Sequence, residues 1–569
     1  MYVDSCTYRR GDKTYSRHLL RTSFRRDGKV RHDTIANISN LPQEEIAALK
    51  AALSPEGRNR RERFSLKDAE ESSFIPTALA GALVTLDTLA RRLGFHKAMG
   101  RSEEAALALW LVFARLMGAE SRLAAARLAK RHAVKTVLGL DSFNEDDLYR
   151  ALDWLEENQE KVEDALLSRK EKPDGRSVFL YDVTSSYLEG TCNELGAFGY
   201  NRDGKAGKMQ IVIGLLTDAD GDPLTVEVFP GNTPDTTTCN GKIDEIKRRF
   251  SADRVVLVGD RGMIKQPQIN RMRNRDDDFD GVINYITAIT KPQIETLLKT
   301  GVIQMELFDE RIHEIISGGV RYVIRRNPAR AGEIAAGRAD KLEKLRRLAD
   351  RKNAYLAGHK RAGVGVALRE VKEWIEKLRA DKWLDARAHD RVISLRVDET
   401  ALHKEAKLDG CYVIKTDVVE TEPLTAERIH NLYKDLSRVE WAFRAFKSYL
   451  ENRPVFVQKE NRTKAHVFTV MLAYKVYRAL MDPLRPHIHK LLALQFDGGA
   501  ENQTLTHEDI IEELNFIMEG TLDIAGTRIP KISAPRPMGR KILEILDVKL
   551  PVPTVKTPAV HTNKKTRGG

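Results

Sequence analysis

Two aspartates, far apart in the chain, occupy positions at which carboxylates could do chemistry. Asp182 lies in the stretch FLYDVTSSYLEG, inside an apolar run that is typical of a core strand. Asp260 directly follows the apolar strand pattern VVLVG, at the end of a strand where sheet proteins tend to build ligand sites. Because an unpaired buried carboxylate is costly, Asp182 indicates a nearby cation, hydrogen-bond network or metal. Taken singly, either aspartate is more often a structural residue.

A third carboxylate, Glu440, lies at the edge of an apolar stripe that predicts one long helix over residues 425–450. Tyr433, Glu440 and Lys447 are spaced by seven residues, or about two helical turns, so they line up on one flank. This flank would form a polar ledge facing whatever the helix packs on. An exposed row, or the flank of a coiled coil, is the plainer alternative.

The three carboxylates together would suit a pair of magnesium ions, because hard cations prefer carboxylate oxygen. Two metals roughly 4 Å apart clamp the attacking and leaving oxygens of an in-line phosphoryl displacement. Metal binding would also compensate the charge of Asp182. The four cysteines are far apart and form no C-x-x-C pair, so neither a zinc site nor a disulfide framework competes with this interpretation.

Two short motifs resemble ion-binding loops but fail in their details. GYNRDGKA has the spacing of a phosphate loop, but Ala206 stands where Ser or Thr should hold magnesium, and a strand pattern follows it. DADGD, residues 218–222, is similar to a calcium loop, but Pro223 and Phe229 occupy its Gly and Glu positions. A hairpin turn explains DADGD better.

The chain has 569 residues, too many for one core, and a formal net charge of +12. This positive excess fits a polyanionic partner, whose phosphates Lys and Arg would neutralise, although a basic protein without such a partner is the alternative. The longest apolar run, residues 105–114, is too short for a membrane span, and the N-terminus has no apolar signal-peptide core. We therefore expect a protein that resides in the reducing cytosol and does not associate with a membrane.

The sequence pattern changes several times along the chain. Residues 1–75 alternate polar and apolar groups around the turn signals GDK and DGK, which predicts a small antiparallel β unit followed by a charged joint. Residues 76–170 have helical periodicity, and their segment SRLAAARLAKRH presents four basic residues, either to DNA or to solvent. Residues 171–290 show the order β-β-β-α-β, which fits a mixed sheet covered by helices.

With these residues in hand, the chain resembles bacterial insertion-sequence transposases of the DDE class, in the insertion-sequence-four superfamily with an RNase H-like core. The matching pieces are LYDVTSSYLEG, IGLLTDADGDPLTVEVFPGNTPD, VVLVGDRGM and VEWAFRAFKSYLENRPVF, in this order. The resemblance implies an α/β fold: an RNase H-like mixed sheet with helices, interrupted by an insertion domain and preceded by the β unit and a helical DNA-binding region. The core would comprise residues 171–290 and 425–485, and the insertion domain would comprise residues 291–424. Residues 486–569 would form a C-terminal helical region that ends in a disordered basic tail.

Carried over by position, the resemblance implies that Asp182, Asp260 and Glu440 are the catalytic, metal-binding triad for two Mg²⁺ ions, with Mn²⁺ as a substitute. The superfamily has a Tyr, Arg, Glu, Lys signature on the glutamate helix. Tyr433 and Lys447 match this signature and would contact DNA, whereas Leu436 stands at the usual Arg position. Either Arg438 or Arg444 could supply the missing cation, and Arg444 is the better placed. Trp441 could stack on an extruded base, although a core position is the plainer interpretation.

We therefore expect a bacterial, cytoplasmic and nucleoid-associated transposase that acts as a homodimer on double-stranded DNA. It would bind the terminal inverted repeats of an insertion sequence, cut the DNA ends and join the 3′-hydroxyls to target DNA. One alternative is an RNase H-like, structure-selective nuclease without strand transfer. The other is a non-catalytic DNA-binding regulator.

Overall fold

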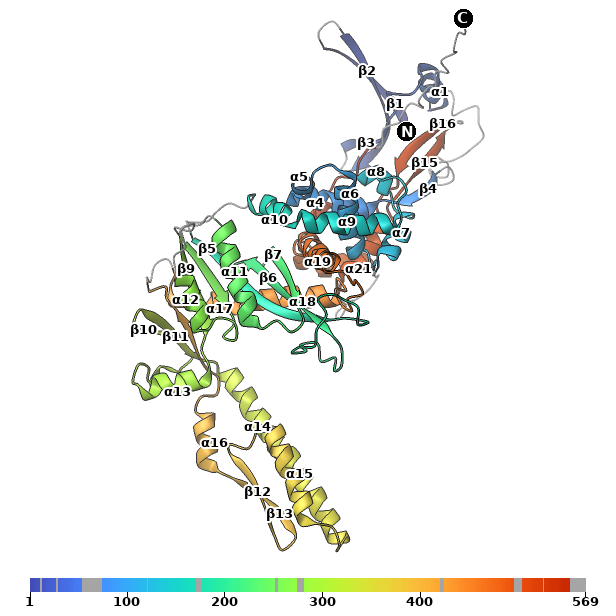
Figure 1. Cartoon of the computed structure of the whole chain (residues 1–569). Coiled ribbons are helices and arrows are strands. Elements are labelled where there is room, and N and C mark those ends of the chain that lie inside the picture. Colours follow the sequence, from blue (N-terminus) through green and yellow to red (C-terminus); the bar gives the residue numbers. More distant parts are fainter. Residues whose placement is uncertain are drawn as a thin grey trace, which may run out of the picture.

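The chain folds into a central sheet with a β ribbon at one end and a helical arm at the other (Figure 1). The computed structural model describes residues 1–10, 13–26, 29–53, 74–119, 121–169, 176–250, 254–273, 281–419, 424–495, 504–524 and 527–552. Four expected features lie outside these residues: the tips of the two N-terminal hairpins, at 11–12 and 27–28, the charged joint at 54–73, and the basic tail at 553–569.

The central sheet has eight strands in the order β10-β11-β14-β9-β8-β5-β6-β7. Strand β5 pairs antiparallel with β6, and β6 with β7, whereas β5, β8 and β9 run parallel. The five strands from β7 to β9 form the mixed sheet that the resemblance to an RNase H-like core implied. The strands are β5 (Arg176–Tyr187), β6 (Gln210–Asp218), β7 (Pro223–Pro230), β8 (Arg254–Gly259), β9 (Val282–Ala288), β10 (His313–Ser317), β11 (Val320–Arg326) and β14 (Cys411–Thr416).

Side-chain alternation along the strands gives the sheet two apolar faces, each covered by helices. Leu180 and Val256 pack on the face that meets α18 and α19, whereas Tyr181 and Leu257 pack with α11 and α12 on the other. Asp182 shares the face of Leu180, so its side chain points toward α18. The helices are α11 (Asp235–Arg249), α12 (Gln266–Arg273), α17 (Ala426–Lys434), α18 (Leu436–Ser448) and α19 (Glu460–Met481).

The helical region wraps around α19, whose residues from Ala465 to Tyr477 are all buried, as expected for a helix packed on all sides. Two predictions in this part of the chain were wrong. Residues 74–79, whose second half we expected to be helical, form strand β4, and the C-terminal region expected to be helical also contains strands. These segments pair in a three-stranded sheet. The local sequence pattern did not predict this sheet, because the partner of β4 lies more than 400 residues away in the chain.

The elements of these two regions complete the body of the molecule. They are β4 (Phe74–Leu79), α4 (Gly81–Leu93), α5 (Phe95–Met99), α6 (Glu103–Leu116), α7 (Arg122–Ala129), α8 (Val134–Leu138), α9 (Glu145–Glu157), α10 (Gln159–Leu167), α20 (Ile488–Gln495), α21 (His507–Asn515), β15 (Met518–Ile524), β16 (Thr527–Ile532) and α22 (Pro537–Ile545). The basic residue Arg122 of α7 is buried, so that side chain does not belong to an exposed basic face.

Residues 291–424, the interval expected to form an insertion domain, divide between the central sheet and the arm. Strands β10, β11 and β14 extend the central sheet through antiparallel pairing, so the sheet is larger than the expected core. Helix α13 packs on the sheet, and residues 328–406 project as the arm, with its own apolar core (Figure 1). The helices and strands of the interval outside the sheet are α13 (Lys291–Lys299), α14 (Pro328–Gly358), α15 (Val364–Lys377), β12 (Leu384–His389), β13 (Val392–Val397) and α16 (Glu399–Ala406).

The N-terminal β unit is a three-stranded antiparallel ribbon, as predicted from its alternating pattern. Leu20 and Ala36 of the ribbon pack on Leu49 of the following helix and on Ile529 of β16, which joins the ribbon to the C-terminal strands. The elements are β1 (Tyr2–Arg10), β2 (Lys13–Arg26), β3 (Lys29–Asn37) and α1 (Gln43–Leu53).

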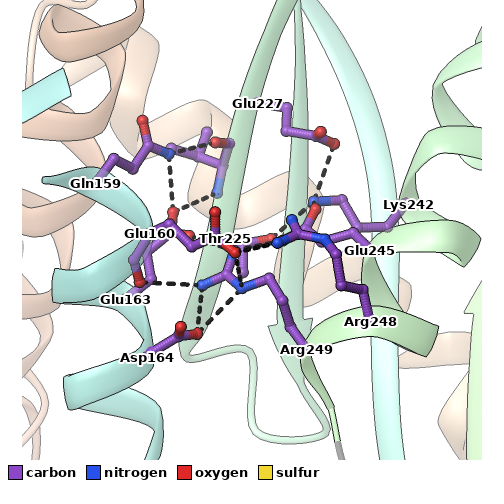
Figure 2. Close-up of polar contacts among 11 residues, drawn as sticks. Gln159, Glu160, Glu163, Asp164, Thr225, Glu227, Lys242, Glu245, Arg248 and Arg249 are labelled. Atoms are coloured by element: carbon purple, nitrogen blue, oxygen red, sulfur yellow. Dashed lines mark hydrogen bonds and ion pairs between the residues drawn. The ribbon is translucent and has the colours of Figure 1, made fainter. Parts of the chain in front are cut away.

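A buried ion network joins the helical region to the central sheet (Figure 2). Arg249 of α11 donates to Glu163 and Asp164 of α10 at 2.9 and 2.7 Å, and to Glu245 at 2.7 Å. The side chains of Arg249 and Glu163 are 7% and 2% exposed. Because water reaches neither charge, each depends on the other for compensation, and the network fixes α10 against α11.

Replacing Arg249 with Met should lower the free energy of unfolding by about 3 kcal/mol, because the change leaves Glu163 buried without its cation and removes one of the two cations, Arg249 and Lys242, that pair with Glu245. Urea unfolding followed by circular dichroism measures this loss. The matched control is Arg248→Met, since Arg248 pairs with Glu160 at the surface, where both side chains are at least half exposed. That control should change stability by less than about 1 kcal/mol. Equal effects of the two substitutions would contradict the assigned role of the network.

Candidate functional site

Asp182, Asp260 and Glu440 line one pocket of about 720 Å³ between the central sheet and helices α17 and α18. Asp182 comes from the middle of β5, Asp260 follows the end of β8, and Glu440 belongs to α18. Residues separated by 78 and 180 positions in the sequence thus meet because β5 and β8 are parallel neighbours and α18 crosses the face of the sheet toward which Asp182 points.

Asp182 is half-buried at the floor of this pocket and carries a perturbed carboxyl group. Burial raises the pKa of Asp182 to about 7, and the negative charges of Asp260 and Glu440 add to the rise. The backbone N–H of Val183 donates to the carboxylate at 2.8 Å and opposes the shift. The two other carboxylates are therefore close enough to disfavour ionisation of the first.

Asp260 is exposed in the turn that ends β8. The backbone N–H of Gly262 donates to its Oδ2 at 3.2 Å, and the Tyr433 hydroxyl donates to its Oδ1 at 3.4 Å. Burial, and then the charge of Asp260, raise the pKa of the Tyr433 phenol well above its ordinary value. Tyr433 is therefore a neutral donor that fixes one oxygen of Asp260, and the Asp260 carboxylate faces the pocket.

The glutamate helix, predicted as one helix over residues 425–450, consists of α17 and α18 with an interruption at Asp435. The Asp435 carboxylate pairs with Arg438 at 3.2 Å, as an acidic residue often does in the first turn of a new helix. The apolar stripe is buried as expected. Tyr433, Glu440 and Lys447 all line the pocket despite the interruption, so they are neither an exposed row nor a coiled-coil flank.

The three predicted DNA-binding side chains, Tyr433, Arg444 and Lys447, lie in the same pocket. Lys447 donates to Thr184 Oγ1 at 2.7 Å and to Asp203 Oδ1 at 2.8 Å, and burial lowers the pKa of its ammonium group. Arg444 is exposed at the pocket wall. Arg438, the other candidate for the missing cation, instead donates to the carbonyl of Ala219 at 2.6 Å, outside the pocket.

The donor set of the pocket fits a hard divalent cation, because its converging groups are carboxylates without competing His or Cys ligands. Within the described ranges of the chain, no three acidic, His or Cys side chains already stand close enough to share one ion. A bound cation would offset the repulsion by Asp260 and Glu440, which adds to the rise that burial causes in the pKa of Asp182.

Sequence comparison decides the family. The model of the transposase DDE domain matches residues 173–476, which include all eight strands of the central sheet from β5 to β14, the arm and both parts of the glutamate helix. The chain belongs to the DDE transposases. The N-terminal domain of IS1634 family transposases also matches, over residues 5–70, which places the protein among bacterial insertion-sequence transposases. Transposase DDE domains generally use divalent metal ions.

Structural similarity to solved transposases is weak. A cryo-EM structure of the piggyBac transposase synaptic complex with hairpin DNA matches with a TM-score of 0.34 and 9% identity, over 76% of each chain. None of the curated proteins matches the transposase. In the part of the transposase that the structure describes, every helix is too short or too polar to cross a bilayer.

Five charged residues of the transposase pocket were not predicted from the sequence: Arg202, Asp203, Asp235, Lys434 and Arg453. Arg202 and Asp203 belong to GYNRDGKA, the segment rejected as a phosphate loop. Arg202 donates to both oxygens of Asp235 at 2.6 and 2.7 Å, and Asp203 accepts from Lys447 and Arg453. The sequence did offer one signal for this part of the site: Arg202 and Asp203 are opposite charges in a loop that is flanked by glycines and lies between two core strands.

Trp441 of the transposase is not a core residue, contrary to the plainer interpretation. Its side chain is 41% exposed, and Arg485 lies over its ring at 5.6 Å from the centroid. Trp441 follows Glu440 by one residue and points outside the apolar stripe, which explains its exposure. The Trp441 ring also lies against Tyr449, with the ring centroids 6.1 Å apart, and Trp441 is not among the residues that line the pocket.

Replacing Asp203 with Asn should destabilise the transposase by about 3 kcal/mol. The Asp203 side chain is 1% exposed and compensates both Lys447 and Arg453, so its loss leaves two cations without a counter-charge. Thermal and urea unfolding measure the effect. The exposed pair of Asp244 and Arg271 supplies the control, because Asp244→Asn should change stability by less than about 1 kcal/mol. If Asp203→Asn were as mild as the control, the anchoring role of Asp203 would be wrong.

Proposed function

We propose that this transposase binds the terminal inverted repeats of its insertion sequence, cuts the DNA at those ends and joins the freed 3′-hydroxyls to target DNA. The observation that supports this activity best is the shared pocket of Asp182, Asp260 and Glu440, in which burial, and then the charges of Asp260 and Glu440, raise the pKa of Asp182. Carboxylates gathered between one face of a mixed sheet and a helix are suited to phosphoryl transfer once their charge is compensated.

In this proposal Asp182, Asp260 and Glu440 hold two Mg²⁺ ions, for which Mn²⁺ can substitute. Bound there, the ions would supply charge neutralisation of the phosphate and an activated water. Tyr433 orients Asp260 through its hydroxyl and lies beside the bound DNA strand. Lys447 and Arg444 present cations to the phosphates that flank the scissile bond, which positions the strand without reading its sequence.

We also propose a division of labour along the chain. Residues 1–75 and 76–170 would bind the inverted repeats, and residues 171–290 with 425–485 would form the catalytic core. Residues 291–424 would act as the inserted region, and residues 486–569 would support the helical region. A homodimer would hold two ends in one synaptic complex, in the bacterial cytoplasm and on the nucleoid.

End cleavage and joining test this proposal. The full-length protein is incubated with Mg²⁺ and DNA that carries the inverted repeats flanking its coding frame, and the products are separated on denaturing gels. We expect cuts at the repeat ends and joined products with target DNA. Cutting without preference for the ends, and without joining, would support the nuclease instead. Tight binding without nicking under Mg²⁺ or Mn²⁺ would support the regulator.

A further inference from the structure

The outer halves of the N-terminal β ribbon are exposed on both faces. Strand β1 pairs with residues 13–21 of β2, and β3 pairs with residues 19–26, so two hairpins extend in opposite directions from a common middle. Among the described residues of the ribbon, those of the middle pack on the rest of the protein, through the buried side chains of Leu20 and Ala36. Residues 5–9, 15–17, 23–25 and 29–33 are all exposed, and the β1–β2 hairpin projects away from the body (Figure 1).

The projecting β1–β2 hairpin carries an exposed aromatic pair. Tyr8 and Tyr15 are 52% and 43% exposed, and their rings stack with centroids 5.7 Å apart. The cross-strand pairs Tyr8–Tyr15 and Cys6–Arg17 place all four side chains on one face of the hairpin. A cross-strand Tyr pair stabilises a hairpin, but such stabilisation does not account for the cations that surround it.

The ribbon is also strongly basic. Residues 2–37 contain nine Lys and Arg residues but only four Asp and Glu residues. One of the four, Asp4, is neutralised by Arg21 at 2.7 Å. Exposed basic residues occur on both hairpins and are Arg9, Arg17, Arg25, Lys29 and Arg31. A positive, projecting ribbon is complementary in charge to a phosphate backbone.

We propose that the β1–β2 hairpin enters the major groove of double-stranded DNA, with the face of Cys6, Tyr8, Tyr15 and Arg17 toward the bases. The major groove of B-DNA, about 12 Å wide, admits a two-stranded β ribbon, and an Arg side chain can bond the edge of guanine there. Arg9, on the opposite face, and the second hairpin reach the flanking phosphates. The inference rests on the proposed function only in taking the ends of the insertion sequence as the bound DNA.

DNA binding by charge-neutralised variants gives the first test. Fluorescence anisotropy compares full-length Arg9→Gln/Arg17→Gln with the wild type, on duplex DNA carrying an inverted repeat, over a series of salt concentrations. We expect affinity to fall at least about tenfold near 0.15 M salt, and the slope of log K against log salt to shrink by about 1 to 2. Circular dichroism melting checks that the variant is folded.

A matched control separates the hairpin from the net charge of the chain. Arg387→Gln/Arg396→Gln removes the same charge from another exposed hairpin, β12–β13 of the arm, and should leave affinity within about twofold of the wild type. An equal loss of affinity in both variants, or no loss in the first, would overturn the proposal. Weaker capture of an acidic peptide, with unchanged DNA binding, would also overturn it.

Disulfide cross-linking gives the second test, because Cys6 lies on the face proposed to meet the bases. Cys6 and Cys192 are exposed, whereas Cys239 and Cys411 are buried, so Cys192→Ser leaves Cys6 as the accessible thiol. A duplex with a disulfide tether on a base in the major groove should exchange with Cys6 in this variant, and not in Cys6→Ser. Absence of a cross-link for every tether position would overturn the inference.

The outcome of these two tests does not depend on the proposed cleavage and joining of DNA. Cross-linking requires no cleavage, so it should succeed even in a protein that binds DNA and never cuts it. A wild-type protein that cuts the repeat ends, but whose Cys6 never cross-links, would overturn the hairpin proposal and leave the transposase activity standing.

Discussion

Replacing Asp182 with Asn is expected to reduce cleavage at the ends of the insertion sequence by at least about a thousand-fold, or about 4 kcal/mol of barrier. The amide keeps the size of the side chain but loses the negative charge that the pocket directs at a cation. The charges of Asp260 and Glu440 both act on Asp182, and all three side chains line the same pocket. End cleavage under Mg²⁺, measured under single-turnover conditions, gives the rate.

Binding to the same DNA should stay within about twofold, because the hairpin and the pocket cations are unchanged. The control is Asp244→Asn, an exposed carboxylate of α11 outside the pocket, which should cut at the wild-type rate. Undiminished cleavage by Asp182→Asn would remove Asp182 from the catalytic site, and loss of DNA binding would assign it a structural role instead.

The same substitution should stabilise the fold when divalent ions are absent. The pKa of Asp182 rises from an ordinary 3.8 to about 7, so the folded state holds this proton more tightly than the unfolded state does. The carboxyl group therefore contributes stability that is complete below about pH 4 and is lost as pH rises through 7. At pH 8 the wild type bears a buried, repelled charge that Asn lacks, which should make Asp182→Asn more stable by about 1–3 kcal/mol.

Unfolding in urea with a chelator present, at pH 5 and at pH 8, measures this difference. We expect the advantage of Asp182→Asn to be larger at pH 8 than at pH 5, and Mg²⁺ at pH 8 to stabilise the wild type but not the variant. An advantage that does not depend on pH would contradict the raised pKa. A wild type indifferent to Mg²⁺ would contradict its compensation by metal.

Local sequence patterns predicted the strands that carry the two aspartates, because alternation and apolar runs determine which face each side chain occupies. Asp182 and Leu180 share a face for this reason, and Asp260 ends its strand as its pattern indicated. The seven-residue spacing of Tyr433, Glu440 and Lys447 correctly placed the three side chains on one flank despite the break at Asp435. The residues on both sides of the break continue the same buried stripe.

These local patterns could not predict which strands pair, or which side chains meet, when the residues are far apart in the sequence. Cys411–Thr416 and Val392–Val397 have similar strand signatures, yet the first joins the central sheet and the second a separate hairpin in the arm. Asp203 is invisible as a site residue until the fold brings it to Lys447, 244 positions away. Such contacts depend on tertiary packing, which a local pattern does not encode.

Binding of Mn²⁺ tests most directly whether the three carboxylates form one metal site. Electron paramagnetic resonance follows free Mn²⁺ as it is titrated into the wild type and into Asp182→Asn, Asp260→Asn and Glu440→Gln, with Asp244→Asn as the control. The shared pocket predicts that the wild type and the control bind the ion, and that each of the three pocket variants weakens this binding at least about tenfold. Wild-type affinity in any one of the three variants would show that its carboxylate does not belong to the site.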